Sequence, residues 1–295
     1  MTALFPGFSQ HTVGTKDAEI NLRRGGEGPP VLLLHGYPET HLCWHRVAPA
    51  LARRFTVVVP DLRGYGDSSK PPSSPDHAVY SKRSMAQDMI EVMAQLGFSR
   101  FAVVGHDRGA RVAYRMALDH PGAVTRMAVL DIVPTYTTWT RMQMSRGLKT
   151  YHWFFLAQPD GLPERLIGAD AAYYLKEKLR RWSGSADAFP DDVVAEYVRC
   201  FSDPACIHAT CEDYRAGATI DFELDKADYG KRKIACPMLA LWGRRGFAKG
   251  NEDSENPLAD WREWAEDVRG GPIRCGHFLP EEAPEETLKA LEEFL

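Results

Sequence analysis

Short apolar runs alternate along the chain with segments whose apolar residues recur at helical spacing. The runs, which end mostly in Gly or Pro, predict buried strands within residues 29–38, 53–69, 100–107, 124–134, 236–246 and 271–278. Helical spacing predicts amphipathic helices over residues 84–97, 108–121 and 283–295. Strands that alternate with helices predict an α/β fold, with a mostly parallel central sheet flanked by helices on both faces.

The pattern changes between Pro134 and about Thr219, where the chain is rich in Trp, Tyr, Met and Arg and its apolar spacing is helical throughout. Strands return after this stretch, so we expect a helical cap inserted over the carboxyl ends of the sheet, where open α/β sheets bind ligands. The predicted division is a core over residues 1–134, a cap over 135–219 and the second part of the core over 220–295.

Composition and charge give no indication of several classes of binding partner or cofactor. The formal net charge is -4, which gives no indication of a nucleic acid or an anionic membrane as a partner. No apolar run reaches the roughly 20 residues that span a bilayer, and the N-terminus shows no secretion signal. Six cysteines without a CxxC pair favour free thiols in a reducing cytoplasm. No pattern of ligands completes a metal site, and we expect no cofactor.

The stretch "VVGHDRGARVAY", Val103 to Tyr114, is typical of a strand–turn–helix elbow that presents a nucleophile. Gly105 and Gly109 flank Asp107 in the place where an esterase has serine. A carboxylate is suited to displacing a leaving group from a saturated carbon, which gives an alkyl ester on the enzyme. The leaving group would then be a halide or an epoxide oxygen. The alternative is an ordinary loop in which Asp107 caps the helix.

A catalytic base and its acid partner are predicted on later strands. His277, in "RCGHFLPEEAP", follows the last predicted strand and is the candidate base that activates water. The sequence "LWGRRG" offers no acid after the preceding strand, so we assign the orienting carboxylate to Asp131 in "MAVLDIVP". The alternatives are a surface histidine and a strand-end capping aspartate.

Two arginines begin the helix after Asp107. Arg108 and Arg111 are three residues apart and share a helix face in the first turn, where positive charge is unfavourable unless an anion binds. A carboxylate substrate is such an anion. The alternatives are solvated arginines or partners for acidic cap residues. The backbone N–H groups of Tyr37 and Arg108 are predicted to form the oxyanion hole.

The motifs "HGYPETHLCWHR", "DLRGYGDSS", "GHDRGARVAYRMALDHP", "LDIVPTY", "YHWFFLAQP", "CEDYRAGA" and "GHFLPEEAP" together resemble the fluoroacetate dehalogenases of the α/β-hydrolase superfamily, from about Phe5 to the C-terminus. The resemblance implies that Asp107 attacks the α-carbon. It also implies a homodimer and assigns the remaining roles: Arg108 and Arg111 to the substrate carboxylate, His277 and Asp131 to the base and its acid, and His152, Trp153 and Tyr214 to the fluoride. Trp182 is a candidate for the wall of the pocket.

The predicted function is hydrolytic dehalogenation of a short 2-haloacid, with fluoroacetate, which would give glycolate and fluoride, as the first choice. An epoxide hydrolase would use the same Asp107, His277 and Asp131, with cap tyrosines to protonate the opening oxygen. The arginine pair argues against it, because a neutral epoxide needs no cations. A third reading is a non-catalytic α/β-hydrolase that binds a ligand, which the intact catalytic set disfavours.

Overall fold

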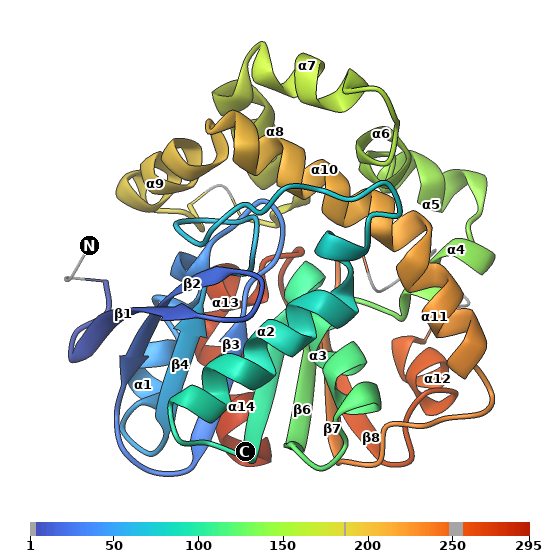
Figure 1. Ribbon diagram of the computed structural model, residues 1–295. Helices are drawn as coiled ribbons and strands as arrows, with labels where there is room; N and C mark the ends of the chain where they lie inside the picture. The colour runs from blue at the N-terminus through green and yellow to red at the C-terminus, as the bar shows by residue number, and fades with distance from the viewer. Residues whose placement is uncertain (1–3, 186, 248–255) are drawn as a thin grey trace.

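The computed structural model describes residues 4–185, 187–247 and 256–295. Its centre is an eight-stranded sheet in the order β1-β2-β4-β3-β5-β6-β7-β8 (Figure 1). The pairs β1–β2 and β2–β4 are antiparallel, and every other neighbouring pair is parallel, so the predicted mostly parallel sheet is confirmed. The strands are β1 (Phe8–Gly14), β2 (Glu19–Gly25), β3 (Pro30–Leu34), β4 (Thr56–Pro60), β5 (Phe101–His106), β6 (Val124–Leu130), β7 (Met238–Gly243) and β8 (Val268–Ile273).

Two strands at one edge of the sheet were not among the predicted elements. β1 and β2 form a hairpin, and β1 is at most half-buried along its whole length. An edge strand that is solvated in this way carries polar residues at most positions, so it lacks the continuous apolar run of a buried parallel strand. At the other edge, β8 begins and ends earlier than predicted, and His277 therefore lies in the loop after it.

Helices cover both faces of the sheet, with α2 and α3 in front and α14 behind in the view of Figure 1. The helices outside the segment between β6 and β7 are η1 (His41–Trp44), α1 (Ala48–Leu51), η2 (Ala78–Tyr80), α2 (Lys82–Gln95), α3 (Asp107–Asp119), α12 (Pro257–Arg262), α13 (Leu279–Glu282) and α14 (Pro284–Phe294). The segment predicted as one C-terminal helix thus contains α14, with the short α13 just before it. Within the described ranges, no helix is both long and apolar enough to cross a membrane.

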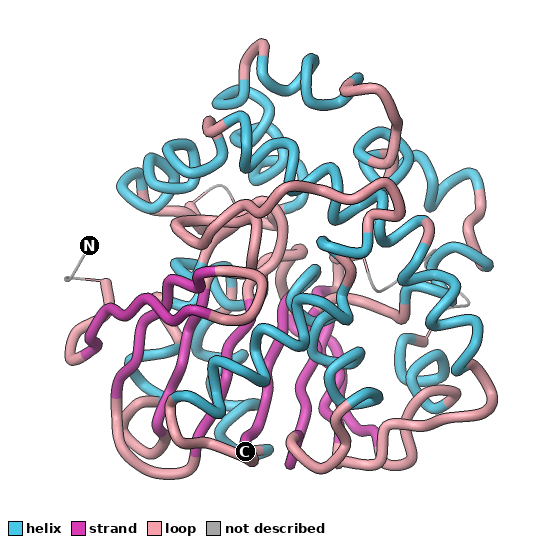
Figure 2. Tube along the Cα trace, in the orientation of Figure 1, coloured by secondary structure: helices cyan, strands magenta, loops and turns pink. Residues whose placement is uncertain are grey.

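Between β6 and β7 the chain is helical, and Figure 2 shows only helices and loops in this upper part of the molecule. The helices are α4 (Thr135–Thr140), α5 (Met144–Lys149), α6 (His152–Leu156), α7 (Leu162–Gly168), α8 (Ala171–Trp182), α9 (Asp191–Phe201), α10 (Pro204–Ala218) and α11 (Ile220–Asp228). Only Thr219 separates α10 from α11, so no loop marks the predicted cap boundary, and the division at residues 134 and 219 stays a prediction.

Candidate active site

Asp107 lies at the junction of β5 and α3 with a left-handed backbone, at φ 44°. This conformation is strained for a residue with a side chain and is typical of functional turns. The turn leaves no room for side chains beside it: a Cβ on Gly105 would lie 2.5 Å from Cα of Ala110, and one on Gly109 would lie 2.4 Å from the carbonyl oxygen of His35. The two glycines therefore allow β3, β5 and α3 to approach closely enough to present Asp107.

The two oxygens of the Asp107 carboxylate have different surroundings. Oδ1 accepts a hydrogen bond of 3.0 Å from the backbone N–H of Tyr37, and Oδ2 lies 3.8 Å from Nε2 of His277. Burial alone would raise the pKa of Asp107, but the electrostatic interactions of its carboxylate with His277, His106 and Arg108 outweigh burial and lower it. Asp107 is therefore ionised at neutral pH, with Oδ1 held and Oδ2 directed toward the histidine.

His277 lies between Asp107 and Asp131. Its Nδ1 is 2.6 Å from Oδ2 of Asp131, so Nδ1 carries the proton and Nε2 can act as a base toward the Asp107 side. Nε2 has no hydrogen-bond partner, and the ring is 1% exposed. The backbone N–H of His277 donates to the carbonyl oxygen of Trp182, at 3.0 Å, which ties the loop after β8 to the end of α8.

The first residues after β7, Arg244 to Phe247, include no acid and enclose Asp131. The N–H groups of Gly243 and Phe247 donate to its carboxylate at 3.1 and 2.7 Å. A Cβ on Gly246 would lie 2.1 Å from Oδ1 of Asp131. The space that an acid after "LWG" would occupy is thus filled by the carboxylate of Asp131, which follows β6. Gly246 leaves room for this carboxylate because it has no side chain.

A second ion pair beneath the nucleophile was missed by the sequence analysis. His106 places Nδ1 2.9 Å from Oε2 of Glu39 and Nε2 2.8 Å from the carbonyl oxygen of His277. Both ring nitrogens face acceptors, so both carry protons and the imidazole is a cation. Burial opposes this charge, but Glu39 raises the pKa of His106 to about 9. The only sequence signal was the position of His106 directly before Asp107.

The two predicted arginines are both buried but differ in their partners. Arg111 is 3% exposed and donates to the carbonyl oxygen of Val133 and to the Thr135 hydroxyl, at 3.1 and 3.0 Å. No carboxylate of the described part of the chain forms an ion pair with it. Arg108 is held by Asp213, with Nε at 3.1 Å from Oδ2 and Nη2 at 2.6 Å from Oδ1, and only its Nη1 lacks a partner.

The residues assigned to the halide meet above the nucleophile. The ring centres of His152 and Trp153 lie 5.7 and 6.0 Å from that of Tyr214. The Tyr214 hydroxyl and Nδ1 of His152 are buried and have no hydrogen-bond partners among the residues that the structure describes. Trp182 adds a wall beside them, with its ring centre 4.5 Å from His152 and 5.8 Å from His277. The structure thus brings these side chains together with the predicted catalytic set.

A small cavity lies beside Asp107, Arg111 and Trp153. It has about 20 Å³ of space for the centre of a water-sized sphere, close to what a single water molecule needs. A cavity of this size suits a ligand of few atoms. The described residues that line it are Asp107, Arg111, Asp131, Ile132, Val133, Thr138, Arg146, Thr150, Trp153 and Phe247.

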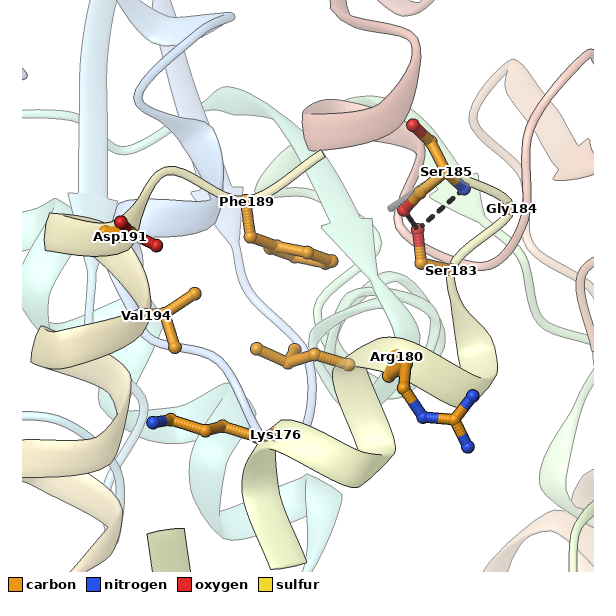
Figure 3. A pocket seen from close by; sticks show the side chains of 9 residues that line it. Lys176, Arg180, Ser183, Gly184, Ser185, Phe189, Asp191 and Val194 are labelled. Atoms are coloured by element: carbon orange, nitrogen blue, oxygen red, sulfur yellow. Dashed lines mark hydrogen bonds between the residues drawn. The ribbon is translucent and has the colours of Figure 1, made fainter. Parts of the chain in front are cut away.

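A larger cavity of about 480 Å³ lies between α8 and α9. Figure 3 shows side chains of its wall, with Val194 facing the aliphatic part of Lys176 and Phe189 on the side away from Lys176. None of the predicted site residues lines it. Cavity volume alone would therefore not identify the candidate active site, which is the small cavity at Asp107. Among the residues described, no group of three or more His, Cys, Asp or Glu side chains could hold a metal ion.

The chain is similar to several known hydrolases. A fluoroacetate dehalogenase from Burkholderia sp is 45% identical over 293 residues, which cover 99% of this chain and 95% of the relative. A soluble epoxide hydrolase from Corynebacterium sp. (strain C12) is 36% identical over 288 residues, which cover 96% and 92%. A crystal structure from Nostoc sp PCC 7120, provisionally assigned as an α/β hydrolase, is 57% identical with a TM-score of 0.94, over 97% of each chain.

The similarity to fluoroacetate dehalogenase that the motifs predicted is thus confirmed over almost the whole chain. The sequence profile of the alpha/beta hydrolase fold matches residues 29–284, which include the elbow, the helical segment after β6 and the loop that carries His277. The chain belongs to the α/β hydrolase fold family.

Proposed function

We propose that this protein hydrolyses the carbon–halogen bond of short 2-haloacids, with fluoroacetate as the leading substrate and glycolate and fluoride as the products. The observation that carries the proposal is Arg111, a buried cation that lines the same small cavity as Asp107 and has no carboxylate among the described residues to pair with. A buried charge without a partner is costly, and a carboxylate substrate supplies the partner. The dehalogenase relative supports this choice.

In the first step, Oδ2 of Asp107 attacks the saturated carbon that bears the halogen. The carbon–oxygen bond forms as the carbon–halogen bond breaks, and the halide leaves with the bonding electron pair. The Tyr37 N–H, at 3.0 Å from Oδ1, fixes the carboxylate so that Oδ2 is the free nucleophile. The product of this step is an ester between the substrate and Asp107, and a chiral substrate would be inverted at the reacting carbon.

In the second step, Nε2 of His277 takes a proton from water, and the oxygen of that water attacks Cγ of Asp107. Nε2 lies 3.8 Å from Oδ2, too far for a direct hydrogen bond but within reach of a molecule between them. Negative charge develops on Oδ1, where the N–H groups of Tyr37 and Arg108 stabilise it. Asp131 stabilises the histidinium, which then protonates the departing hydroxy acid.

Binding divides between two ends of the substrate. Arg111, with the remaining Nη1 of Arg108, binds the carboxylate, and His152, Trp153 and Tyr214 donate to the halide. Burial, reinforced by the charge of Lys178, lowers the pKa of His152 well below its usual value, so His152 is neutral and offers one N–H. Fluoride is strongly hydrated in water, and three donors in a dry site replace that hydration.

An epoxide hydrolase is the second candidate, and the relative from Corynebacterium favours it. The free hydroxyl of Tyr214 could protonate an epoxide oxygen. A neutral epoxide, however, leaves Arg111 without an anion. The test is to measure fluoride and chloride release from fluoroacetate, difluoroacetate and chloroacetate beside epoxide opening, on one preparation.

Fast halide release with negligible epoxide opening supports the proposal, and the reverse result overturns it. Tight binding of a small carboxylate without turnover of any haloacid, ester or epoxide would identify a non-catalytic ligand-binding protein instead.

We also propose that the protein is a cytoplasmic homodimer that associates through the cap. Large apolar side chains that are more than 40% exposed all fall within residues 144–173 of the described chain: Met144, Leu148, Tyr151, Phe154, Leu162, Leu166 and Tyr173. A second copy would cover this surface, since large exposed apolar patches mark interaction sites. Sedimentation analysis tests the proposal, and a monomer at micromolar concentration would contradict it.

A further inference from the structure

The Asp213 carboxylate accepts four hydrogen bonds at the interface of cap and core. Arg108 donates through Nε and Nη2, at 3.1 and 2.6 Å. Tyr65 donates its hydroxyl to Oδ2 at 2.6 Å, and Lys82 donates its ammonium group to Oδ1. The Asp213 side chain is completely buried. Four bonds use all the acceptor positions of a carboxylate, so Asp213 has no capacity left for the substrate.

The elements that supply these donors hold Asp213 from several directions. Asp213 lies on α10, which passes over the N-terminal ends of α2 and α3 in Figure 1. Lys82 begins α2 and Arg108 lies in the first turn of α3. The carbonyl oxygen of Asp213 also accepts from Nη2 of Arg108, at 2.8 Å. The Arg108 guanidinium is consequently fixed by both the side chain and the backbone of one residue.

This pairing decides what Arg108 can offer to a ligand. The fork of an arginine side chain formed by Nε and Nη2 is the edge that binds a carboxylate bidentately, and in Arg108 this edge is occupied. Nη1 alone is left, buried and without a partner. Asp213 also holds the guanidinium carbon of Arg108 at 4.1 Å from the ring centre of Tyr214, the neighbouring residue on α10.

We infer that Asp213 is a positioning residue that keeps the fork of Arg108 away from the substrate, so that a haloacid is held mainly by Arg111 with its carbon in line with Asp107. This inference rests on the proposed dehalogenase function and deepens it. Without Asp213, Arg108 would turn its fork toward the substrate carboxylate. Binding would be kept or strengthened, but the carbon would be displaced from the line of attack, and misplacement of about 1 Å can lower the rate about 100-fold.

The test is the steady-state kinetics of chloride release from chloroacetate by the full chain and by Asp213→Asn. We expect kcat to fall about 10- to 100-fold, while KM stays equal to that of the wild type or falls. Because unfolded molecules lower the apparent kcat without changing KM, kcat is calculated per folded molecule, from the folded fraction that circular dichroism gives at the assay temperature. A kcat within threefold of wild type, or a large rise in KM, overturns the inference.

Asp88→Asn is the matched control. Asp88 is also buried on α2, accepts from Nε and Nη2 of Arg63 at 2.6 Å each, and accepts from the Thr15 hydroxyl at 2.8 Å. Asp88 does not line the cavity at Asp107, and Arg63 and Thr15, which donate hydrogen bonds to its carboxylate, are not residues of the candidate site. Thermal unfolding is expected to show a loss of stability in both variants, and the split between kcat and KM only in Asp213→Asn. The same split in Asp88→Asn would overturn the inference.

If Asp213→Asn does not fold, Asp213→Glu keeps the buried charge and shifts it by one methylene, so a milder form of the same split is expected. Wild-type kinetics for Asp213→Glu would then overturn the inference. Halide release by the wild-type protein distinguishes a failure of the proposed function from a failure of the role assigned to Asp213. A wild-type protein that releases no halide overturns the proposed function, and this inference with it, whereas normal halide release with an unaffected Asp213→Asn overturns the inference alone.

Discussion

Asp131 and His277 are 146 residues apart in the sequence, yet Oδ2 of Asp131 lies 2.6 Å from Nδ1 of His277. The contact fixes the tautomer of the imidazole, since the carboxylate accepts the Nδ1 proton and leaves Nε2 free toward Asp107. The carboxylate comes from the end of β6, and the histidine comes from the loop after β8. The sheet therefore assembles the base from two distant segments.

Replacing Asp131 by Asn should keep the shape of the site but remove the charge that stabilises the histidinium. We expect kcat for haloacid hydrolysis to fall on the order of 10³-fold. The second step should suffer more than the first, because only the second forms the histidinium. Rapid-quench measurement of the first halide released checks this order, and an equal loss in both steps would contradict the assignment of Asp131.

Replacing Arg111 by Leu removes the unpaired cation of the cavity. We expect KM for chloroacetate to rise at least tenfold and kcat to fall as well, because the same contact both binds the carboxylate and orients the carbon. Steady-state chloride release measures both constants. An unchanged KM would show that the substrate carboxylate does not bind at Arg111, and the preference for haloacids over epoxides would lose its main support.

Replacing Tyr214 by Phe removes a buried hydroxyl that has no hydrogen-bond partner in the described part of the chain. We expect fluoride release from fluoroacetate to slow about tenfold or more, and chloride release from chloroacetate to slow less, because fluoride depends more strongly on hydrogen bonds as it leaves. Chloroacetate serves as the internal control on the same preparation. An equal loss with both substrates would argue for a packing role of Tyr214 instead of a role at the halide.

The ion pair of His106 and Glu39 predicts a dependence of stability on pH. The pKa of His106 in the folded protein is about 9, above the ordinary value near 6.5. The charged form is therefore favoured by folding, so its contribution is complete below about pH 6.5 and is lost as the pH rises through about 9. Urea unfolding of the wild type and of His106→Gln between pH 6 and 10 measures this contribution. A difference between the two proteins that does not shrink toward pH 10 would contradict the assigned charge.

The parallel strands and the elbow around Asp107 could be predicted from the sequence because both depend on local patterns. Buried strands such as β7 are apolar at every position, and Gly105 is required by backbone contacts within one turn. The edge hairpin was missed because β1 is solvated and because β2 buries the polar residues Asn21 and Arg23 among its apolar ones, so neither strand has a continuous apolar run. Its existence depends on pairing with β4, which no local pattern reports.

The partners of buried charges could not be predicted in the same way. The sequence suggested that Arg108 and Arg111 act as an equal pair, but Asp213 on α10 occupies the fork of Arg108. Glu39 likewise meets His106 only after the strands align. Which acid reaches which base is decided by tertiary packing between segments that are far apart, so spacing in the sequence identifies candidate groups but not their pairing.

The central claim is that Asp107 forms an ester that His277 helps to hydrolyse. The most direct test is to incubate His277→Asn with chloroacetate and to measure the mass of the peptide that carries Asp107. We predict that one chloride is released per active site, that turnover then stops, and that this peptide gains one carboxymethyl group, while Asp107→Asn under the same conditions releases no chloride and stays unmodified. Continued turnover of His277→Asn at the wild-type rate with an unmodified peptide would contradict the mechanism.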